Sequence, residues 1–146
     1  MDENTRETWL RRMASTGLAV SDNAAPDGVP SVLEALRSVA NWEVRPTATV
    51  PAGQPRALEE VDRQWRLHAE RCGLFGDDGS FLFSISGAGA SDFGWAVVKW
   101  SADAELAPRL AKPGEGLDFL AMSVDGKVVC AVTEEEYDYW VVVQHL

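Results

Sequence analysis

Alternation of apolar and polar positions is strongest in the second half of the chain, where it predicts a β-sheet. Three runs rich in Val and aromatic residues lie between residues 117 and 146, separated by Asp125-Gly126 and by the glutamates at 134–136. An Asp-Gly pair between such runs is a strong hairpin signal, since a type I′ turn needs positive φ at both central residues. We predict a three-stranded antiparallel meander over residues 117–146.

Two earlier runs also alternate with the period of a strand. Residues 80–86 read SFLFSIS and residues 93–100 read FGWAVVKW, joined by the Gly-rich connection GAGASDFG. They are predicted to pair as a hairpin, which gives about five strands in all. Residues 42–55 contain three prolines. Proline is tolerated at a sheet edge, so we expect at most one short edge strand there, near residues 43–45 or 47–50.

Helical spacing is found in the first half of the chain. Residues 4–17 carry an apolar stripe, Ser31 and Glu34 form a capping box at the start of a second helix, and a third helix is expected within residues 55–73. One face of the third helix collects its apolar and chemically distinctive side chains, which are Leu58, Val61, Trp65, His68 and Cys72. This face is predicted to be buried.

Three helices followed by about five strands predict an α+β fold in a single domain over residues 1–146, with the helices grouped on one face of the antiparallel sheet. A further short helical turn is expected at Pro108, which would break a longer helix. In element order the chain resembles the cone-shaped α+β rolls of ketosteroid-isomerase-like proteins and polyketide cyclases. As a small acidic protein it is also generally similar to bacterial immunity proteins. The first resemblance is one of element order and the second one of size and charge, and neither includes a shared motif.

The net charge of −10 is concentrated in the sheet half. Residues 1–73 carry nine Arg and eleven Asp or Glu, whereas residues 74–146 carry four Lys or Arg and twelve Asp or Glu. A negative surface repels phosphate backbones and anionic lipids, and it speeds encounter with a basic protein. We therefore expect a basic protein partner and neither nucleic acid nor membrane.

The cellular setting follows from the same kind of count. No run approaches the ~20 apolar residues of a membrane span, and the acidic start MDENTRETWLRRM does not read as a secretory signal. Cys72 and Cys130 are the only cysteines, so a disulfide scaffold is not expected. A reducing, cytoplasmic location fits these features.

The chemically distinctive residues favour no reaction. His68 and Cys72 lie four positions apart on one helix face, a spacing that suits two metal ligands. Zinc needs two more ligands that no neighbouring motif supplies, so core packing is the favoured interpretation. The Gly-rich connection and Asp92-Phe93-Gly94 match only fragments of nucleotide-binding and kinase motifs. We expect no cofactor and no metal, and assign no catalytic residue.

The leading hypothesis is a non-catalytic protein-binding domain, such as an immunity protein, an inhibitor or a chaperone, that takes its basic partner on an acidic sheet face. The residues expected to contact the partner are Glu134, Glu135, Glu136 and Asp138, with Asp92 and Trp95 as a second patch. Turns that carry several carboxylates are also common as simple solvated edges.

Six tryptophans motivate an alternative, a small-molecule site inside an α+β cone. Its expected lining is Trp65, His68, Trp95, Tyr139 and Trp140. The protein would then be a carrier or an acid–base isomerase or cyclase, with His68 or Asp92 as the titrating group. A third hypothesis is a homodimer formed through an exposed Trp-bearing face.

Overall fold

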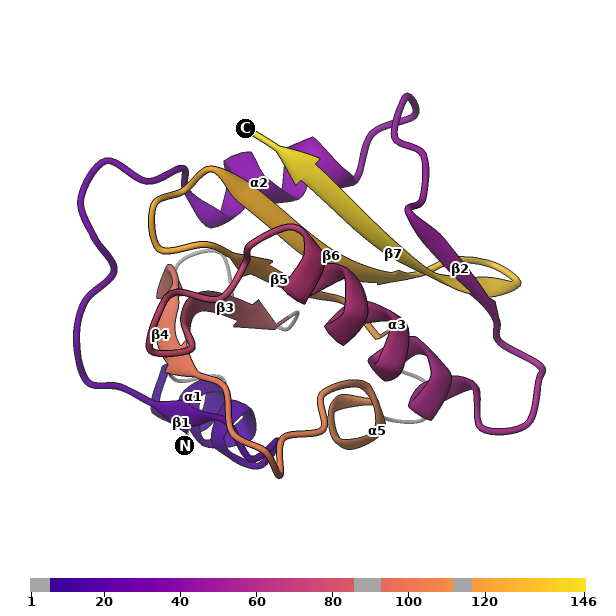
Figure 1. Cartoon of the computed structure of the whole chain (residues 1–146), viewed down its shortest axis with the longest axis horizontal. Coiled ribbons are helices and arrows are strands. Elements are labelled where there is room, and N and C mark those ends of the chain that lie inside the picture. Colours follow the sequence, from indigo (N-terminus) through magenta and orange to yellow (C-terminus); the bar gives the residue numbers. More distant parts are fainter. Residues whose placement is uncertain (1–5, 86–92, 112–116) are drawn as a thin grey trace.

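The computed structural model describes residues 6–85, 93–111 and 117–146, and an antiparallel sheet lies at its centre. Seven strands form the sheet in the order β1-β4-β3-β5-β6-β7-β2 (Figure 1). The strands are β1 (Ala19–Val20), β2 (Ala48–Pro51), β3 (Ser80–Ile85), β4 (Ala96–Lys99), β5 (Phe119–Met122), β6 (Val128–Glu134) and β7 (Asp138–His145). The helices are α1 (Arg6–Ala14), α2 (Val32–Val39), α3 (Ala57–Arg71) and α5 (Ala107–Leu110). The predicted α+β class and antiparallel sheet are confirmed.

The described residues form four helices and seven strands, which differ from the predicted three N-terminal helices and about five strands. The strands expected from alternation correspond to β3 to β7, and two short edge strands extend the sheet at either side. β1 pairs with β4 over two residues, which is too short for any alternation to be seen. β2 pairs with β7 and ends at Pro51, at the edge where a missing N–H is tolerated. α5, which carries Pro108 in its first turn, corresponds to the short helical turn predicted there.

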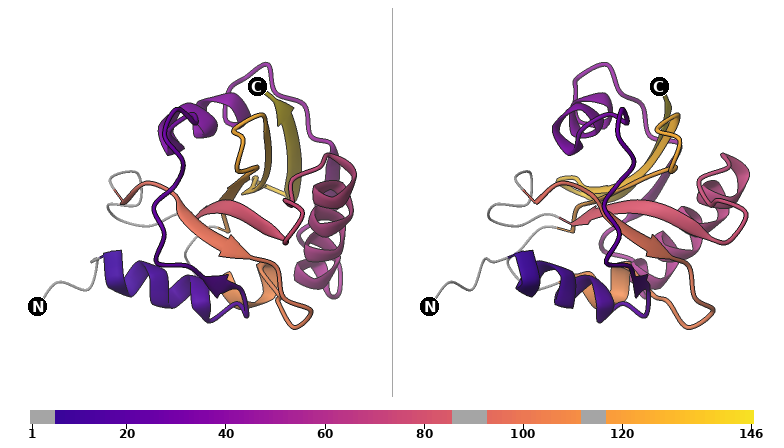
Figure 2. Two further views of the ribbon diagram at one scale, coloured as in Figure 1. Left: turned by 60° about the vertical axis from the view of Figure 1, so that its left-hand side comes forward. Right: turned by 90° about the vertical axis from the view of Figure 1, so that its left-hand side faces the viewer.

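The helices do not share one face of the sheet, which corrects the predicted layering. α1, α3 and α5 pack with the inner residues of one face, whereas α2 packs on the other face. Figure 2 shows α2 and α3 on opposite sides of the strands. The reason lies in the central strands, because all four residues of β5 and five of the six in β3 are buried. A strand that is apolar on both faces needs cover on both.

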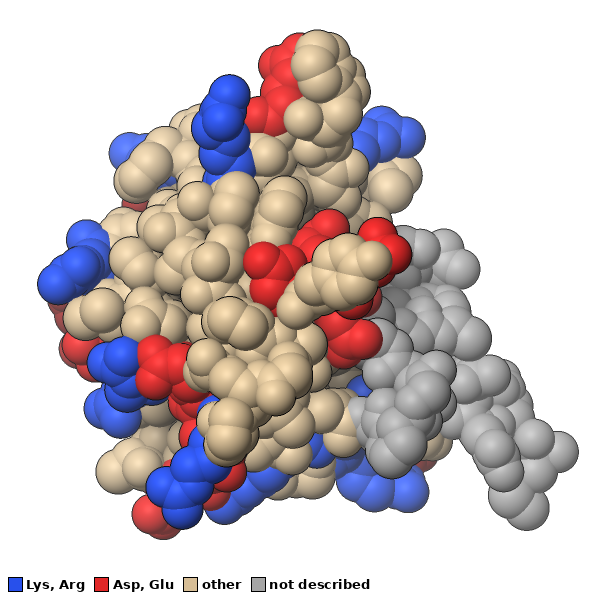
Figure 3. Space-filling model, turned by 90° about the vertical axis from the view of Figure 1, so that its right-hand side faces the viewer, with Lys and Arg blue, Asp and Glu red and all other residues tan. Residues whose placement is uncertain are grey.

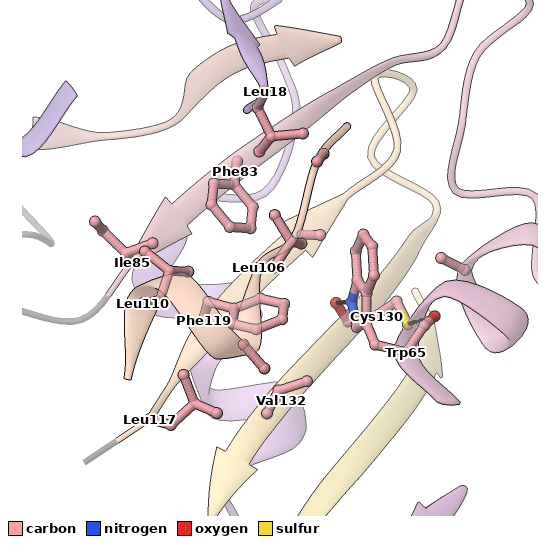
Figure 4. Packing of buried hydrophobic residues seen from close by; sticks show 14 of the residues in the cluster. Leu18, Trp65, Phe83, Ile85, Leu106, Leu110, Leu117, Phe119, Cys130 and Val132 are labelled. Carbon is pink, nitrogen blue, oxygen red and sulfur yellow. Dashed lines mark hydrogen bonds between the residues drawn. The ribbon is translucent and has the colours of Figure 1, made fainter. Parts of the chain in front are cut away.

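Three buried indoles tie these layers to the sheet. Trp65 of α3 donates through Nε1 to the carbonyl of Cys130 at 3.1 Å, and its ring meets those of four other aromatic residues at centroid distances of 5.7 to 6.1 Å (Figure 4). Trp9 of α1 donates to the carbonyl of Ile85 at 3.1 Å. On the other face, Trp95 donates to the carbonyl of Pro30 at 2.8 Å. Each bond satisfies a buried N–H and fixes the direction of a large apolar ring.

The local signal at the start of α2 agrees with the structure. The capping box of Ser31 and Glu34 is present in both directions, as predicted. α5 is held from a distance: the Asp62 carboxylate of α3 accepts from the N–H groups of Leu106 and Ala107, each at 3.0 Å. These two donors belong to the first turn of α5 and have no partner within their own helix.

The predicted hairpin at Asp125-Gly126 is confirmed, but its turn is not of type I′. Gly126 has a φ of 74°, whereas Asp125 has no positive φ, and the Gly126 N–H donates to the Ser123 carbonyl at 2.9 Å. The loop is longer than two residues because polar side chains stabilise it. The Ser123 hydroxyl donates to the Asp125 carboxylate at 2.6 Å and accepts from the N–H groups of Lys127 and Val128.

Among the residues that the structure describes, none of the helices combines the length and the apolar character that crossing a membrane requires.

Candidate functional site: an acidic turn at one end of the sheet

The candidate site lies where β6 turns into β7. We use the name acidic turn for Asp118, Glu134, Glu135, Glu136, Tyr137 and Asp138. Tyr137 stands at its tip with 78% of its surface exposed, and the three glutamates beside it are exposed as well. In Figure 3, which views the molecule from this side, acidic side chains gather in the middle of the face. The carboxylates therefore lie at the turn between the last two strands, where the sequence places them, and this turn is at an end of the sheet.

Hydrogen bonds from three strands hold the acidic turn in place. The turn is closed by the Glu135 N–H, which donates to the Asp138 carbonyl at 2.8 Å. On one side the Asp118 carboxylate accepts from the Glu134 N–H at 3.1 Å, and the Glu134 carboxylate accepts from the Leu117 N–H at 3.0 Å. These two bonds join the start of β5 to the end of β6.

The loop after β2 supports the turn from the other side. The Ala52 N–H donates to the Tyr137 carbonyl at 3.0 Å, next to the last residue pair of β2 and β7. From β6, the Thr133 hydroxyl donates to the Glu135 carboxylate at 2.8 Å. The backbone that carries Tyr137 is thus bonded on both flanks.

The electrostatics of the site are those of unneutralised carboxylates. Burial raises the pKa of the half-buried Asp118 carboxyl, and the charges of Glu134 and Glu135 raise it further, although the Glu134 N–H acts in the opposite sense. The pKa of the Tyr139 hydroxyl is raised by burial and by Glu134. Within the described residues, no ion pair involves a carboxylate of the acidic turn.

This arrangement suits recognition of a cation carried by another molecule. Carboxylates bind Lys and Arg through charge-assisted hydrogen bonds. The face of an exposed tyrosine ring attracts the same cations, and tyrosine is enriched among residues that dominate protein–protein binding energy. A metal site is not formed by the same groups: in the described parts of the chain, no three His, Cys, Asp or Glu side chains are placed to hold an ion.

The predicted contact residues are only partly brought together. Glu134, Glu135, Glu136 and Asp138 share the acidic turn. Asp92 lies outside the described residues. Trp95 is only 6% exposed and belongs to the core under α2, so the prediction of Trp95 as a contact residue is corrected.

The residues expected to line one small-molecule pocket lie on two faces of the sheet. Trp65 and Tyr139 belong to the core beside α3, and Trp95 and Trp140 belong to the core beside α2. His68 is half-buried on α3, and burial, together with the charge of Arg71, lowers the pKa of its imidazole. The five side chains therefore do not enclose a common space.

The exposed tryptophan surface expected for a homodimer reduces to one residue of the described chain. Trp42, in the loop after α2, is 91% exposed. The other tryptophans that are described are buried or half-buried. The homodimer stays a prediction, and the mass of the protein in solution at several concentrations tests it.

Asp118 and Tyr137 are members of the site that the sequence reasoning missed. Hydrophobic alternation counts Tyr137 as the start of the last strand, although it directly follows the three glutamates of the turn. Asp118 was recoverable by counting back from the hairpin at Gly126, since antiparallel pairing sets Phe119 opposite Val132 and brings Asp118 near the end of β6.

Comparisons of this chain with models of protein families, with curated proteins and with solved structures gave no match. A function has to follow from the chemistry of its own residues.

Proposed function

We propose that the chain is a non-catalytic protein-binding domain that docks a basic partner at the acidic turn. One observation carries this proposal: exposed carboxylates that make no ion pair among the described residues stand next to the exposed Tyr137 in the chain, on a turn bonded from both flanks. Such a turn loses little conformational freedom on binding, so ordering offsets little of the attraction. An immunity, inhibitor or chaperone-type protein of the cytoplasm is the concrete form.

The partner surface is defined by the chemistry of the turn. It presents Arg or Lys side chains that reach Glu135 and Glu136, with one of them placed over the ring of Tyr137. Exposed charges mainly accelerate encounter and are screened by salt. The association rate should therefore fall steeply with ionic strength. The contact of Tyr137 with the partner, which buries the ring in the complex, should set the dissociation rate.

A pair of variants tests the turn against net charge alone. Glu135→Lys with Glu136→Lys alters the turn, and Asp22→Lys with Asp27→Lys makes the same charge change on the exposed loop between β1 and α2, at the far side of the molecule in Figure 1. The probe is a short peptide rich in Lys and Arg, titrated into ¹⁵N-labelled protein. We expect the largest shifts at residues 134–138, and a loss of affinity of roughly tenfold or more in the turn variant only.

Two results would contradict the proposal. Shifts spread evenly over the acidic surface would mean that the peptide senses total charge. Equal losses of affinity in the two variants would likewise mean that the peptide responds to total charge and does not bind at the acidic turn. The search for the natural partner uses the same proteins as bait: a basic protein retained by wild type and by the loop variant, but lost from the turn variant, is the expected outcome.

A further inference from the structure

α2 carries apolar residues on two of its sides. Val32, Ala35 and Val39 recur at helical spacing and are buried against the sheet. Leu33 and Leu36, one helical turn apart, form a second row that is 45% and 41% exposed. A surface helix usually has a single apolar side, which faces the core, and polar residues elsewhere. The second row is therefore more than the attachment of α2 to the sheet requires.

Trp42 adds to this exposed apolar surface at the C-terminal end of α2. Its loop is bonded to the helix, because the Asn41 side chain donates to the Arg37 carbonyl at 2.9 Å and accepts from the Glu43 N–H at 3.0 Å. Five large hydrophobic side chains are exposed in the described residues, and three of them lie within residues 33–42. Figure 2 shows α2 at the outside of the molecule. Exposed apolar side chains gathered in this way are typical of an interaction surface.

The charges around these side chains are balanced. We use the name α2 face for Leu33, Glu34, Leu36, Arg37 and Trp42. Residues 31–45 carry two Glu and two Arg, a net charge of zero, in a chain whose net charge is −10. Two copies of so acidic a chain repel each other over most of their surfaces, but not where the local charge is zero. Glu34 and Arg37 are exposed, and neither makes an ion pair among the described residues.

We propose that the α2 face joins two copies of this chain in a symmetric dimer, with the two α2 helices antiparallel. A two-fold axis sets each residue against the same surface of the partner. The midpoint of Leu33 and Leu36 and the midpoint of Glu34 and Arg37 differ by one residue, about 1.5 Å along the helix. An axis at this position sets Leu33 beside the partner's Leu36, and Glu34 beside the partner's Arg37, each pair twice. The α2 face is thus complementary to itself in apolar contact and in charge.

The expected dimer is weak. One short helix and one indole ring bury less surface than the roughly 1,200–2,000 Å² of a stable complex, so we expect a dissociation constant in the micromolar range or above. The leucines and Trp42 supply most of the affinity, because exposed ion pairs contribute little and mainly fix the orientation of the two helices. The α2 face shares no residue with the acidic turn, so the dimer does not depend on the proposed function.

Sedimentation equilibrium of the full chain tests the dimer over a roughly hundredfold range of concentration that reaches about 1 mM. For wild type we expect a reversible monomer–dimer equilibrium. Leu33→Gln with Leu36→Gln should abolish the dimer without a change of charge. Tyr137→Ala, which removes an exposed ring from the acidic turn, should associate as wild type does. A wild-type chain that stays monomeric throughout, or a dimer that the leucine variant leaves unchanged, would overturn the proposal.

Charge exchange tests the antiparallel arrangement. Glu34→Lys and Arg37→Glu each create two like-charge contacts in the dimer, so each should raise the dissociation constant by roughly tenfold or more. Net charge alone would instead strengthen the dimer of Glu34→Lys, because that variant is less acidic.

An equal mixture of the two charge variants is the decisive sample. Every contact in the mixed dimer pairs opposite charges, so the mixture should associate nearly as tightly as wild type. Circular dichroism checks that both variants are folded, since Glu34 also belongs to the capping box of α2. A mixture of folded variants that associates no better than either variant alone would overturn the antiparallel pairing of α2.

Discussion

Two tryptophans mark the extremes of what single residues do in this protein. Trp65 is fully buried at the centre of an aromatic cluster and bonded to the Cys130 carbonyl, whereas Trp42 is 91% exposed. A buried Trp contributes through its area, its ring contacts and its satisfied N–H. An exposed one contributes almost nothing to folding. The same residue type therefore separates a structural position from a surface position.

Replacing each of these tryptophans by Ala should have very different effects on stability. For Trp65→Ala we expect a loss of about 3–5 kcal/mol in the free energy of unfolding, because a large cavity opens and the Cys130 carbonyl loses its donor. Trp42→Ala should change it by no more than ~0.5 kcal/mol. Urea unfolding followed by circular dichroism measures both. Similar losses in the two variants would show that Trp65 is not central to the core.

The residue scale also shows what the sequence could predict and what it could not. The spacing of α3 correctly predicts that Val61 and Trp65 are buried, and the alternation of the run at 95–100 predicts opposite faces for Trp95 and Trp100. The carbonyl that accepts a hydrogen bond from each buried indole could not be predicted from the sequence. Trp65 and Cys130 are 65 positions apart, and no local pattern relates residues at that distance.

The turn between β5 and β6 depends on its contact with the segment before α2. Gly126 has a φ of 74°, and a Cβ there would lie 2.8 Å from Pro30 Cδ and 3.3 Å from Val29 Cβ. Gly28 has a similar φ of 84°, but a Cβ added there meets nothing within 4 Å. The two glycines share the same backbone requirement and differ only in packing.

Substitution of each glycine by Ala separates backbone strain from packing. Gly28→Ala should cost about 1 kcal/mol, the ordinary penalty of a left-handed Ala. Gly126→Ala should cost about 2–3 kcal/mol, because the segment at 29–30 must also move away from the turn. The difference in urea midpoints at constant slope measures the contact. Equal costs would mean that this segment yields freely and that α2 is loosely attached to the sheet.

Element-scale prediction succeeded where a pattern is local and long enough. Alternation predicts β3 to β7, and the capping box predicts the start of α2, because both signals lie within a few residues of one another. β1 has only two residues, and it exists because its backbone pairs with β4. The side of the sheet that α2 covers depends on the path of the loops before and after it. The spacing of apolar residues within α2 does not predict that path.

The acidic turn shows the same limit for function. The run of three glutamates predicts a charged turn, and the structure adds Asp118, which directly precedes β5, and a hydrogen bond from the loop after β2. Both additions come from pairing between strands. Trp95 of the expected second patch is buried under α2, and such burial is a tertiary property.

At the scale of the whole molecule, two of the carboxyl groups that contribute negative charge are partly buried, and burial disfavours their charged form. Burial raises the pKa of Asp62 and Asp118, although backbone N–H groups bonded to each oppose the shift. Hydrogen bonds with the side chain and backbone of Ser80 and with Lys99 lower the pKa of Asp78 to about 2. The first two carboxyls favour folding when they are protonated, and the third favours it when it is charged.

These directions set how stability changes between neutral and mildly acidic pH. A carboxyl whose folded pKa is raised stabilises the fold most below the unfolded value near 3.9, and this contribution is lost as pH rises through the folded pKa. Wild type should therefore gain stability from Asp62 and Asp118 as pH falls from 7 to about 4.5. Below about 4, Asp78 and the other carboxyls with lowered pKa begin to take protons, and stability falls again.

A double variant isolates the two buried carboxyls from every other titrating group. Asp62→Asn with Asp118→Asn keeps an oxygen acceptor for the N–H groups of Leu106, Ala107 and Glu134, but neither side chain titrates. Urea midpoints of wild type and variant are compared at pH 7, 5.5 and 4.5. The titration of His68, whose lowered pKa acts in the opposite sense, is common to both proteins and cancels. The urea midpoint of wild type, relative to that of the variant, should rise as pH falls. A difference that stays constant with pH would mean that burial does not raise the pKa of either carboxyl. Repulsion between surface charges would then be the main electrostatic cost in this acidic molecule.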